Sequence, residues 1–326
     1  MRPRVYLTQP VAASALERLR GAADVAMNPD ALHIATKPEL IEGARGADIL
    51  FCLLHDVVDR EVIAANPKLK AVASMTITPA DIDVTEATRR RIPVTVIPAL
   101  LLNDATADLA WALLMAAARR LAEGDRLMRS GVFPGSQSSH MVGAGVSGKA
   151  LGIVGMGGVG KAMARRAGGF AMRVLYYDPN RLAPAEEKEL GLTWAPLDKL
   201  LADADFVSIH ARLTPETRHL IGHRELGVMK PTAFLVNTAR GPIVDEEALV
   251  RALAEKRIAG AGLDVYEHEP RPHASLLRME NVVFSPHTGS AVKELREAMA
   301  HVVVDNIIAV LEGRRPPNCY NPEVYR

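Results

Sequence analysis

Short apolar runs alternate along the whole chain with segments of helical hydrophobic spacing. Each run is apolar at consecutive positions, which is typical of strands in a parallel sheet that helices cover on both faces. The pattern therefore predicts an α/β chain built from βαβ units. The predicted strands are residues 4–7, 49–54, 69–74, 93–97, 150–154, 173–177, 206–209, 233–236, 259–263 and 282–284.

Helical spacing is clearest in five segments, which are residues 11–20, 104–121, 158–170, 245–255 and 291–312. The segment 104–121 is rich in Ala and Leu and apolar on most sides, so we expect it to be buried or to form a subunit contact. The last helix is followed by Gly313, a residue type that commonly ends helices. The polar, glycine-rich stretch 130–148 predicts a long surface loop that crosses between two structural units.

Composition narrows the class of protein. At about 150 residues per domain, 326 residues predict two domains. The chain has 39 Lys and Arg against 38 Asp and Glu, and this balance argues against a dedicated nucleic-acid binder. Its two cysteines, Cys52 and Cys319, exclude a disulfide framework and a cysteine-based zinc module, and the histidines show no metal-binding spacing. With no signal-peptide pattern and no run of about 18 apolar residues, we expect a cytoplasmic protein without a membrane span.

A glycine motif follows one of the predicted strands. Residues 155–160 read Gly-Met-Gly-Gly-Val-Gly, they open a predicted helix, and the next strand ends in Asp178, 18 positions after Gly160. This context is the one that dinucleotide binding requires. We expect Gly155 to permit a tight turn, Gly157 to let the backbone approach a pyrophosphate, and Gly160 to bring the helix close to the strand. The N–H groups around Gly158 and Val159 would face the phosphates.

Two other patterns overlap or lie close to the glycine motif, and neither fits its context as well. Residues 143–148 also match G-x-G-x-x-G but precede a strand, so we interpret them as loop. Residues 155–161 match most of a P-loop, but Ala162 stands where a magnesium-binding hydroxyl is needed. Asp178 would accept hydrogen bonds from the ribose hydroxyls and repel a 2′-phosphate, which favours NAD over NADP. We interpret Arg181 as a surface charge, but its positive charge could weaken the preference for NAD, so binding of NADP stays open.

Four ordered motifs carry a family resemblance: Val-Ser-Ile-His-Ala at 207–211, Val-Asn-Thr-Ala-Arg-Gly-Pro-Ile-Val-Asp at 236–245, Gly-Leu-Asp-Val-Tyr-Glu-His-Glu-Pro at 262–270, and Ser-Pro-His-Thr-Gly-Ser-Ala at 285–291. With the glycine motif, they make the chain resemble the D-2-hydroxyacid dehydrogenase family, most of all its glyoxylate and hydroxypyruvate reductases. The resemblance implies two Rossmann-like domains with parallel sheets and an active site in the cleft between them. It implies a discontinuous substrate domain (1–100 and 291–326), an NAD-binding domain (101–290), and a homodimer with helix 104–121 as a plausible contact.

The resemblance also implies residue roles. Arg240 would bind the substrate carboxylate and carbonyl, His287 would donate the proton, and Glu269 would pair with His287. A 2-keto acid gains charge on its oxygen as hydride reaches C2, so a protonated imidazole beside a carboxylate and a forked guanidinium suit the reaction. Taken singly, each could be structural, and Glu269 could be a solvated charge like Glu267. Cofactor-lining positions would be His210, Ala211, Arg212, Thr238 and Asp264.

Two segments depart from the family pattern. Thr76, Ile77 and Thr78 occupy the loop expected to bind the substrate, where glycines are common, and threonine rarely adopts a positive φ. Either the loop changes shape, or the hydroxyls touch the substrate, or the turn is benign. Arg212 replaces a usual proline and could add positive charge near the cofactor or substrate.

The resulting functional hypothesis is NAD(P)-dependent reduction of a small 2-keto acid such as glyoxylate or hydroxypyruvate. Two alternatives stay open at this point. One is oxidation of another small anion, of the formate or phosphite type, on the same fold. The other is an NAD-sensing, corepressor-like binding protein that keeps the same side chains.

Overall fold

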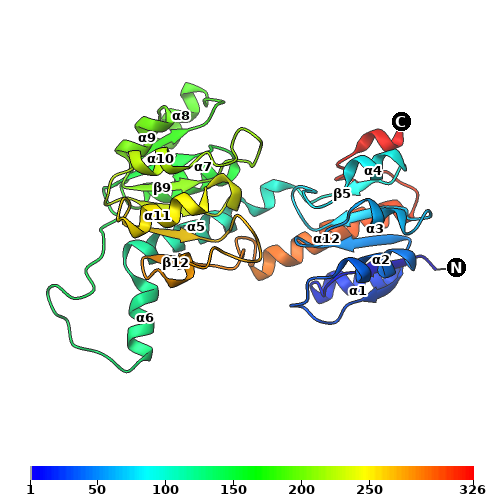
Figure 1. Cartoon of the computed structure of the whole chain (residues 1–326). Coiled ribbons are helices and arrows are strands. Elements are labelled where there is room, and N and C mark those ends of the chain that lie inside the picture. Colours follow the sequence, from blue (N-terminus) through cyan, green and yellow to red (C-terminus); the bar gives the residue numbers. More distant parts are fainter. Residues whose placement is uncertain (1) are drawn as a thin grey trace. The chain divides into compact units, whose positions relative to one another are not determined.

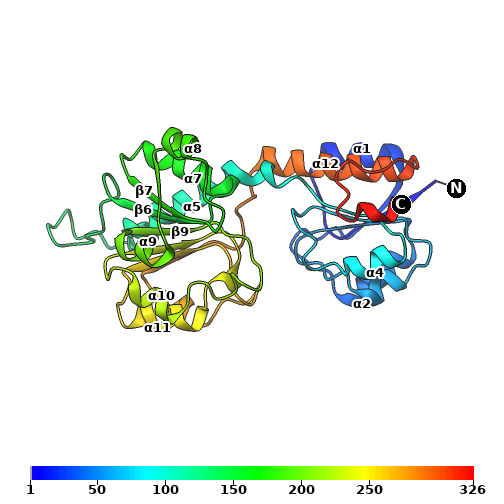
Figure 2. The same ribbon diagram turned by 90° about the horizontal axis from the view of Figure 1, so that it is seen from above.

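The structure is a computed structural model that describes residues 2–326, and the chain divides into two compact units. Unit 1 comprises the chain up to Leu101 together with Ala291–Arg326, and unit 2 comprises Leu102–Ser290. Both contain a parallel sheet covered by helices on its two faces (Figures 1 and 2), which confirms the predicted α/β class.

Unit 1 is a five-stranded parallel sheet in the order β2-β1-β3-β4-β5. Helices α1 and α12 cover one face, and α2 and α4 lie on the other (Figure 2), where α3 adds Val62 and Ile63 to the same apolar core. The strands are β1 (Arg4–Leu7), β2 (Asp24–Met27), β3 (Ile49–Cys52), β4 (Ala71–Ser74) and β5 (Val94–Thr95). The helices are α1 (Ala13–Ala22), α2 (Lys37–Arg45), α3 (Arg60–Ala64), α4 (Val84–Arg89) and α12 (Lys293–Leu311).

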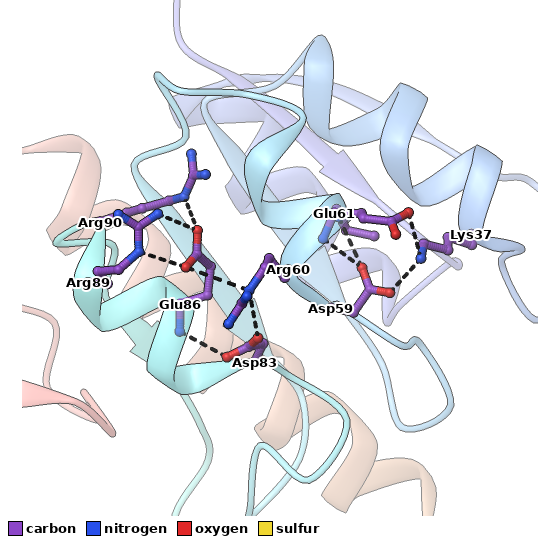
Figure 3. A network of polar contacts seen from close by, with 9 residues as sticks. Lys37, Asp59, Arg60, Glu61, Asp83, Glu86, Arg89 and Arg90 are labelled. Carbon is purple, nitrogen blue, oxygen red and sulfur yellow. Dashed lines mark hydrogen bonds and ion pairs between the residues drawn. The ribbon is translucent and has the colours of Figure 1, made fainter.

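Polar contacts link the short helices of unit 1 (Figure 3). Asp83 caps α4 by accepting the N–H of Glu86. The Glu86 side chain is only 4% exposed and accepts hydrogen bonds from Arg89 and Arg90, while Arg60 of α3 lies 3.9 Å from its carboxylate. These arginine hydrogen bonds lower the pKa of Glu86 to about 2, so the group stays ionised. A second set of ion pairs joins α2 to α3 through Lys37, Asp59 and Glu61.

Unit 2 is a seven-stranded parallel sheet in the order β12-β11-β10-β9-β6-β7-β8. Helices α5 and α7 pack into one apolar core, and α9, α10 and α11 into the other. The strands are β6 (Ala150–Val154), β7 (Arg173–Tyr177), β8 (Leu192–Trp194), β9 (Phe206–Ile209), β10 (Phe234–Asn237), β11 (Gly260–Leu263) and β12 (Val282–Phe284). The helices are α5 (Asn103–Ala118), α6 (Leu121–Arg129), α7 (Gly158–Gly168), α8 (Pro184–Leu190), α9 (Leu197–Asp203), α10 (His223–Val228) and α11 (Glu246–Ala254).

The structure departs from the sequence-based elements in three places. Strands β2 and β8 were not predicted, because these edge strands are three or four residues long and only partly buried. The predicted helix 104–121 ends at Ala118, and Arg120, with φ of +53°, separates α5 from α6. The stretch 130–148 is a loop, but both of its ends belong to unit 2, so the prediction that it crosses between units is wrong.

One helical stretch in the described part of the chain, Ala99–Ala118, is long and apolar enough by composition to cross a membrane. Burial accounts for part of this apolar character, because α5 contributes to the core of unit 2 against α7 and the sheet, although only 22% of the stretch is buried. The fully or nearly buried residues of α5 are Ala107, Ala110, Leu113, Leu114, Ala117 and Ala118.

Candidate active site

The carboxyl ends of six neighbouring strands of unit 2 carry most of the predicted site residues. Neighbouring strands lie about 4.8 Å apart, so residues that follow them form a row along one edge of the sheet. The strand order reverses between β6 and β9, which is where ligands bind in sheets of this kind. In spatial order the row reads Asp178 after β7, Gly155 after β6, His210 after β9, Arg240 after β10, Asp264 after β11 and His287 after β12.

The glycine turn after β6 is shaped by close backbone contacts. Gly155 has φ of +94°, and a Cβ there would lie 2.5 Å from the backbone nitrogen of Ala211. A Cβ at Gly160 would lie 2.2 Å from the carbonyl oxygen of Gly155, so the helix approaches the strand as predicted. In contrast, a Cβ at Gly157 would meet no atom within 4 Å. Gly157 therefore presents bare backbone to open space at the start of α7.

The first turn of α7 begins directly at this open backbone. The first N–H groups of a helix have no partner within it, and those of Gly158 and Val159 belong to this turn. Gly158 has a second role that the motif alone did not indicate, because a Cβ there would lie 2.4 Å from the Asn103 side chain of α5. The turn, the open backbone and the helix start together fit a dinucleotide pyrophosphate.

Asp178 lies at the end of β7 beside this turn. Its Oδ2 accepts the N–H of Met156 at 2.9 Å, and its Oδ1 accepts the N–H of Asn180 at 2.9 Å. A carboxylate has about four acceptor positions, so these two bonds orient the group and leave capacity for ribose hydroxyls. The residues present therefore fit the adenosine end of NAD.

Two buried polar atoms at the next strand ends lack a hydrogen-bond partner within residues 2–326. They are Nδ1 of His210 and Oγ1 of Thr238, which follow the register pair Ile209 and Asn237 of β9 and β10. The other ring nitrogen of His210 lies 2.8 Å from Oγ of Ser208. Burial lowers the pKa of His210 to about 3, so the ring is neutral. An unpaired buried polar atom is costly in a folded chain, and two adjacent ones at a strand edge are typical of a ligand site.

The remaining predicted cofactor positions after β9 differ in character. Ala211 lies with its backbone against Gly155, so it shapes the turn. Arg212 is exposed, and its carbonyl oxygen accepts the hydroxyl of Thr217 at 2.6 Å. Arg212 stands where the family usually has proline, and a hydrogen bond from the Thr217 side chain closes the turn that begins there.

Asp264, after β11, anchors the loop that carries His287. The side chain is 1% exposed, and its two oxygens accept the N–H groups of Thr288 at 2.7 Å and Gly289 at 2.9 Å. The backbone carbonyl of Asp264 accepts the N–H of His287 at 2.8 Å. This anchoring was not predicted, since the resemblance placed Asp264 only beside the cofactor.

His287 and Glu269 form the predicted pair. Nδ1 of His287 lies 2.7 Å from Oε2 of Glu269, and the two side chains are 21% and 19% exposed. The other oxygen of Glu269 accepts the N–H of Tyr266 at 3.1 Å, which fixes the carboxylate. Because Nδ1 is engaged by Glu269, Nε2 is the ring nitrogen directed away from this carboxylate.

Arg240 follows β10 and lies in a loop that is packed directly on the Glu269 loop. The side chain of Asn237 donates to the carbonyl oxygen of Arg240 at 3.0 Å. A Cβ at the next residue, Gly241, would lie only 1.8 Å from the carbonyl oxygen of Tyr266. The loops after β10 and β11 therefore touch backbone to backbone, which ties the position of Arg240 to that of Glu269.

Glu267 was interpreted from the sequence as a possible solvated charge, and this is wrong. Its side chain is 10% exposed and contacts Nε2 of His219 at 2.6 Å and Arg218 at 3.3 Å. Glu267 and Glu246 exchange hydrogen bonds, each carboxylate accepting the backbone N–H of the other residue. These contacts brace the loop that carries Glu269, and no local pattern could have indicated them.

The predicted substrate loop lies in unit 1, after β4. The hydroxyl of Thr76 donates to the carbonyl oxygen of Thr78 at 2.8 Å and lies 2.7 Å from the hydroxyl of Ser74. None of residues 76–78 has a positive φ. The Thr76 hydroxyl thus closes the turn without a glycine conformation, and the part of Thr76, Ile77 and Thr78 in substrate binding stays a prediction.

The chain is similar in sequence to a known protein family and to named relatives. Residues 111–289 match the model of the D-isomer specific 2-hydroxyacid dehydrogenase, NAD binding domain. A glyoxylate reductase of Korarchaeum cryptofilum is 48% identical over 328 residues, which covers 100% of this chain and 98% of the relative.

Solved structures of other proteins are similar to this chain over nearly its whole length. The TT0316 protein of Thermus thermophilus has a TM-score of 0.90 and 41% identity, covering 97% of this chain and 99% of that one. A glyoxylate reductase from Paecilomyes thermophila has a TM-score of 0.82 and 31% identity, covering 98% of both chains.

Proposed function

The chain belongs to the D-isomer specific 2-hydroxyacid dehydrogenase family and is an NAD(P)-binding oxidoreductase; we propose that it reduces glyoxylate, and hydroxypyruvate as a related substrate, to the 2-hydroxy acid. The proposal rests above all on the Glu269–His287 pair at the carboxyl edge of a sheet whose reversal point carries the glycine turn. Relatives named glyoxylate reductase, among them one of Thermococcus litoralis at 44% identity, support the choice of substrate.

The proposed chemistry divides the work between cofactor and protein. When bound, a reduced nicotinamide would supply the hydride that C2 of the keto acid receives. His287 gives the proton on Nε2 to the carbonyl oxygen, and Glu269 stabilises the imidazolium through Nδ1. Arg240 binds the planar carboxylate with a pair of N–H donors and stabilises charge on the carbonyl oxygen. In the oxidative direction His287 takes the proton back.

Other residues hold His287 and Glu269 in position without touching the substrate. Asp264 holds the His287 loop through three hydrogen bonds, and the Glu267 brace holds the loop of Glu269. Because proton transfer requires a donor within about 3 Å of the acceptor, small movements of either loop would slow the reaction.

The decisive experiment measures NADH consumption with glyoxylate, hydroxypyruvate and pyruvate for the wild type and His287→Ala. We expect turnover of the wild type and a loss of at least about 100-fold in kcat for the variant. His268→Ala, which changes an exposed histidine on the loop of Glu269, is the matched control and should keep full activity. Unchanged turnover in His287→Ala would refute the assignment of the proton donor. Tight NADH binding without turnover of any keto acid would refute the reductase and favour a binding protein.

We further propose a homodimer and expect the protein to be cytoplasmic. Six of the 16 residues of α5, the expected contact, are buried within its own unit, whereas α6 and the loop after it extend away from the rest of unit 2 (Figure 1). Apolar side chains are exposed on this arm, with Phe133 at 72% and Met128 at 56%. Exposed apolar groups on a projecting segment favour a subunit contact. The arm residues concerned are Leu121, Met128, Val132, Phe133 and Val142.

A further inference from the structure

A cation closely follows, in the sequence, the residue expected at the adenosine end of the cofactor site. Arg181 follows Asp178 by three residues, in the loop that leaves β7. A guanidinium near the ribose would bind the 2′-phosphate that distinguishes NADP from NAD, whereas the Asp178 carboxylate disfavours it. Where the Arg181 side chain points therefore bears directly on cofactor choice.

The structure directs this guanidinium to α8. Nε and Nη2 of Arg181 donate to the two carboxylate oxygens of Glu187 at 2.8 and 2.9 Å, a bidentate pair. The guanidinium carbon lies 5.6 Å from the ring centroid of Trp194, within the range of a cation–π contact. Three contacts thus hold a side chain that is itself 59% exposed.

Glu187 depends on this pairing. Its side chain is 11% exposed, and its other donor is the hydroxyl of buried Tyr176, at 2.6 Å from Oε1. The hydrogen bonds from Arg181 and Tyr176 lower the pKa of Glu187 to about 2, so the group is charged. If Arg181 turned away, a largely buried carboxylate would lose its counter-charge, which is unfavourable.

The same residues support Asp178. Nε1 of Trp194 donates to the carbonyl oxygen of Asp178 at 3.3 Å, and the N–H of Asn180 donates to its carboxylate. The guanidinium of Arg181 is thus engaged by Glu187 and Trp194, in the loop that carries Asp178.

We propose that Glu187 sets the preference of this protein for NAD over NADP by holding Arg181 away from the position of a 2′-phosphate. The inference rests on the proposed cofactor site but not on the identity of the keto acid. Glu187 is a positioning residue in this account, since it acts through Arg181 and touches no cofactor atom.

Calorimetric titration with NADH and with NADPH tests the proposal without turnover. For Glu187→Gln we expect the Kd for NADPH to fall about tenfold, because the released Arg181 would gain about one charge-assisted contact to the 2′-phosphate. The Kd for NADH should stay within about twofold. The double variant Arg181→Ala/Glu187→Gln should lose the gain. Glu189→Gln, an exposed carboxylate on the same helix, is the matched control and should change neither Kd.

Three results would overturn the proposal. The first is an unchanged ratio of the two Kd values in a folded Glu187→Gln variant, and the second is a gain in NADPH affinity that persists in the double variant without Arg181. The third would come from the single variant Arg181→Ala, in which Glu187 is unchanged. Because the wild-type guanidinium is withheld, this variant should bind NADPH within about twofold of the wild type, and a marked loss would show that Arg181 already engages the phosphate. Failure of wild-type turnover would leave these binding comparisons intact.

Discussion

The backbone contact between the loops of Arg240 and Glu269 can be perturbed with a single methyl group. In Gly241→Ala the new Cβ would lie 1.8 Å from the carbonyl oxygen of Tyr266, whereas ordinary contact begins at 3.4 Å, so the loops must separate by 3.4 − 1.8 = 1.6 Å. Neighbouring atoms are backbone and cannot rotate away. The strain should cost about 1–3 kcal/mol of stability, as overpacking does.

The larger effect should be on catalysis. A displacement of about 1 Å in the relative positions of catalytic groups can cost about 100-fold in rate, which equals about 2.7 kcal/mol of transition-state stabilisation. We therefore expect kcat/KM of Gly241→Ala to fall by at least about 100-fold. The NADH affinity should stay within about twofold, because the glycine turn and Asp178 lie at other strand ends.

Steady-state kinetics with glyoxylate, NADH titration and thermal unfolding give the three readouts. Gly227→Ala is the matched control, because Gly227 is exposed in α10 and its Cβ would meet no atom within 4 Å. That variant should keep full activity and gain up to about 1 kcal/mol of stability from helix propensity. Wild-type kcat/KM in Gly241→Ala would show that the relative position of the two loops does not govern catalysis.

Three further predictions concern separate parts of the molecule. Glu269→Gln should lower kcat about 100-fold with little change in NADH affinity, because the amide cannot stabilise the imidazolium, and wild-type kcat would contradict the pairing. Burial raises the pKa of the Asp56 carboxyl, which is 2% exposed. Its folded pKa thus exceeds its unfolded one, so ionisation costs stability as pH rises through the folded value. Asp56→Asn should accordingly raise Tm more at about pH 8 than at about pH 4, and a gain that is equal or larger at the lower pH would refute this. Phe133→Glu places a charge on the exposed arm and should shift the protein from dimer to monomer in light scattering, whereas an unchanged dimer would locate the contact elsewhere.

Local rules made much of the site predictable. The apolar runs revealed the main strands of both sheets, since strands buried on both faces are continuously apolar. Gly155 and Gly160 were predicted because a tight turn and a close helix approach exclude a side chain, and the structure shows both contacts. Asp178, His210 and His287 follow predicted strands, and parallel strands end at one edge.

Two of the unpredicted features depend on residues far apart in the chain. Glu267 is braced by His219, 48 positions away, and Asp264 anchors backbone groups 24 and 25 positions away. The break at Arg120 is a backbone conformation that helical spacing does not encode.

The sequence by itself determined the fold class, the glycine turn and which chemical groups follow the strands, because periodicity and the steric demands of glycine act over a few residues. Only the tertiary structure decided that Thr76 closes its own turn and that Arg181 pairs with Glu187 beside Trp194. The reason is physical: a charged or hydroxylic side chain has several partners within reach of its backbone, and the folded conformation of the chain selects among them.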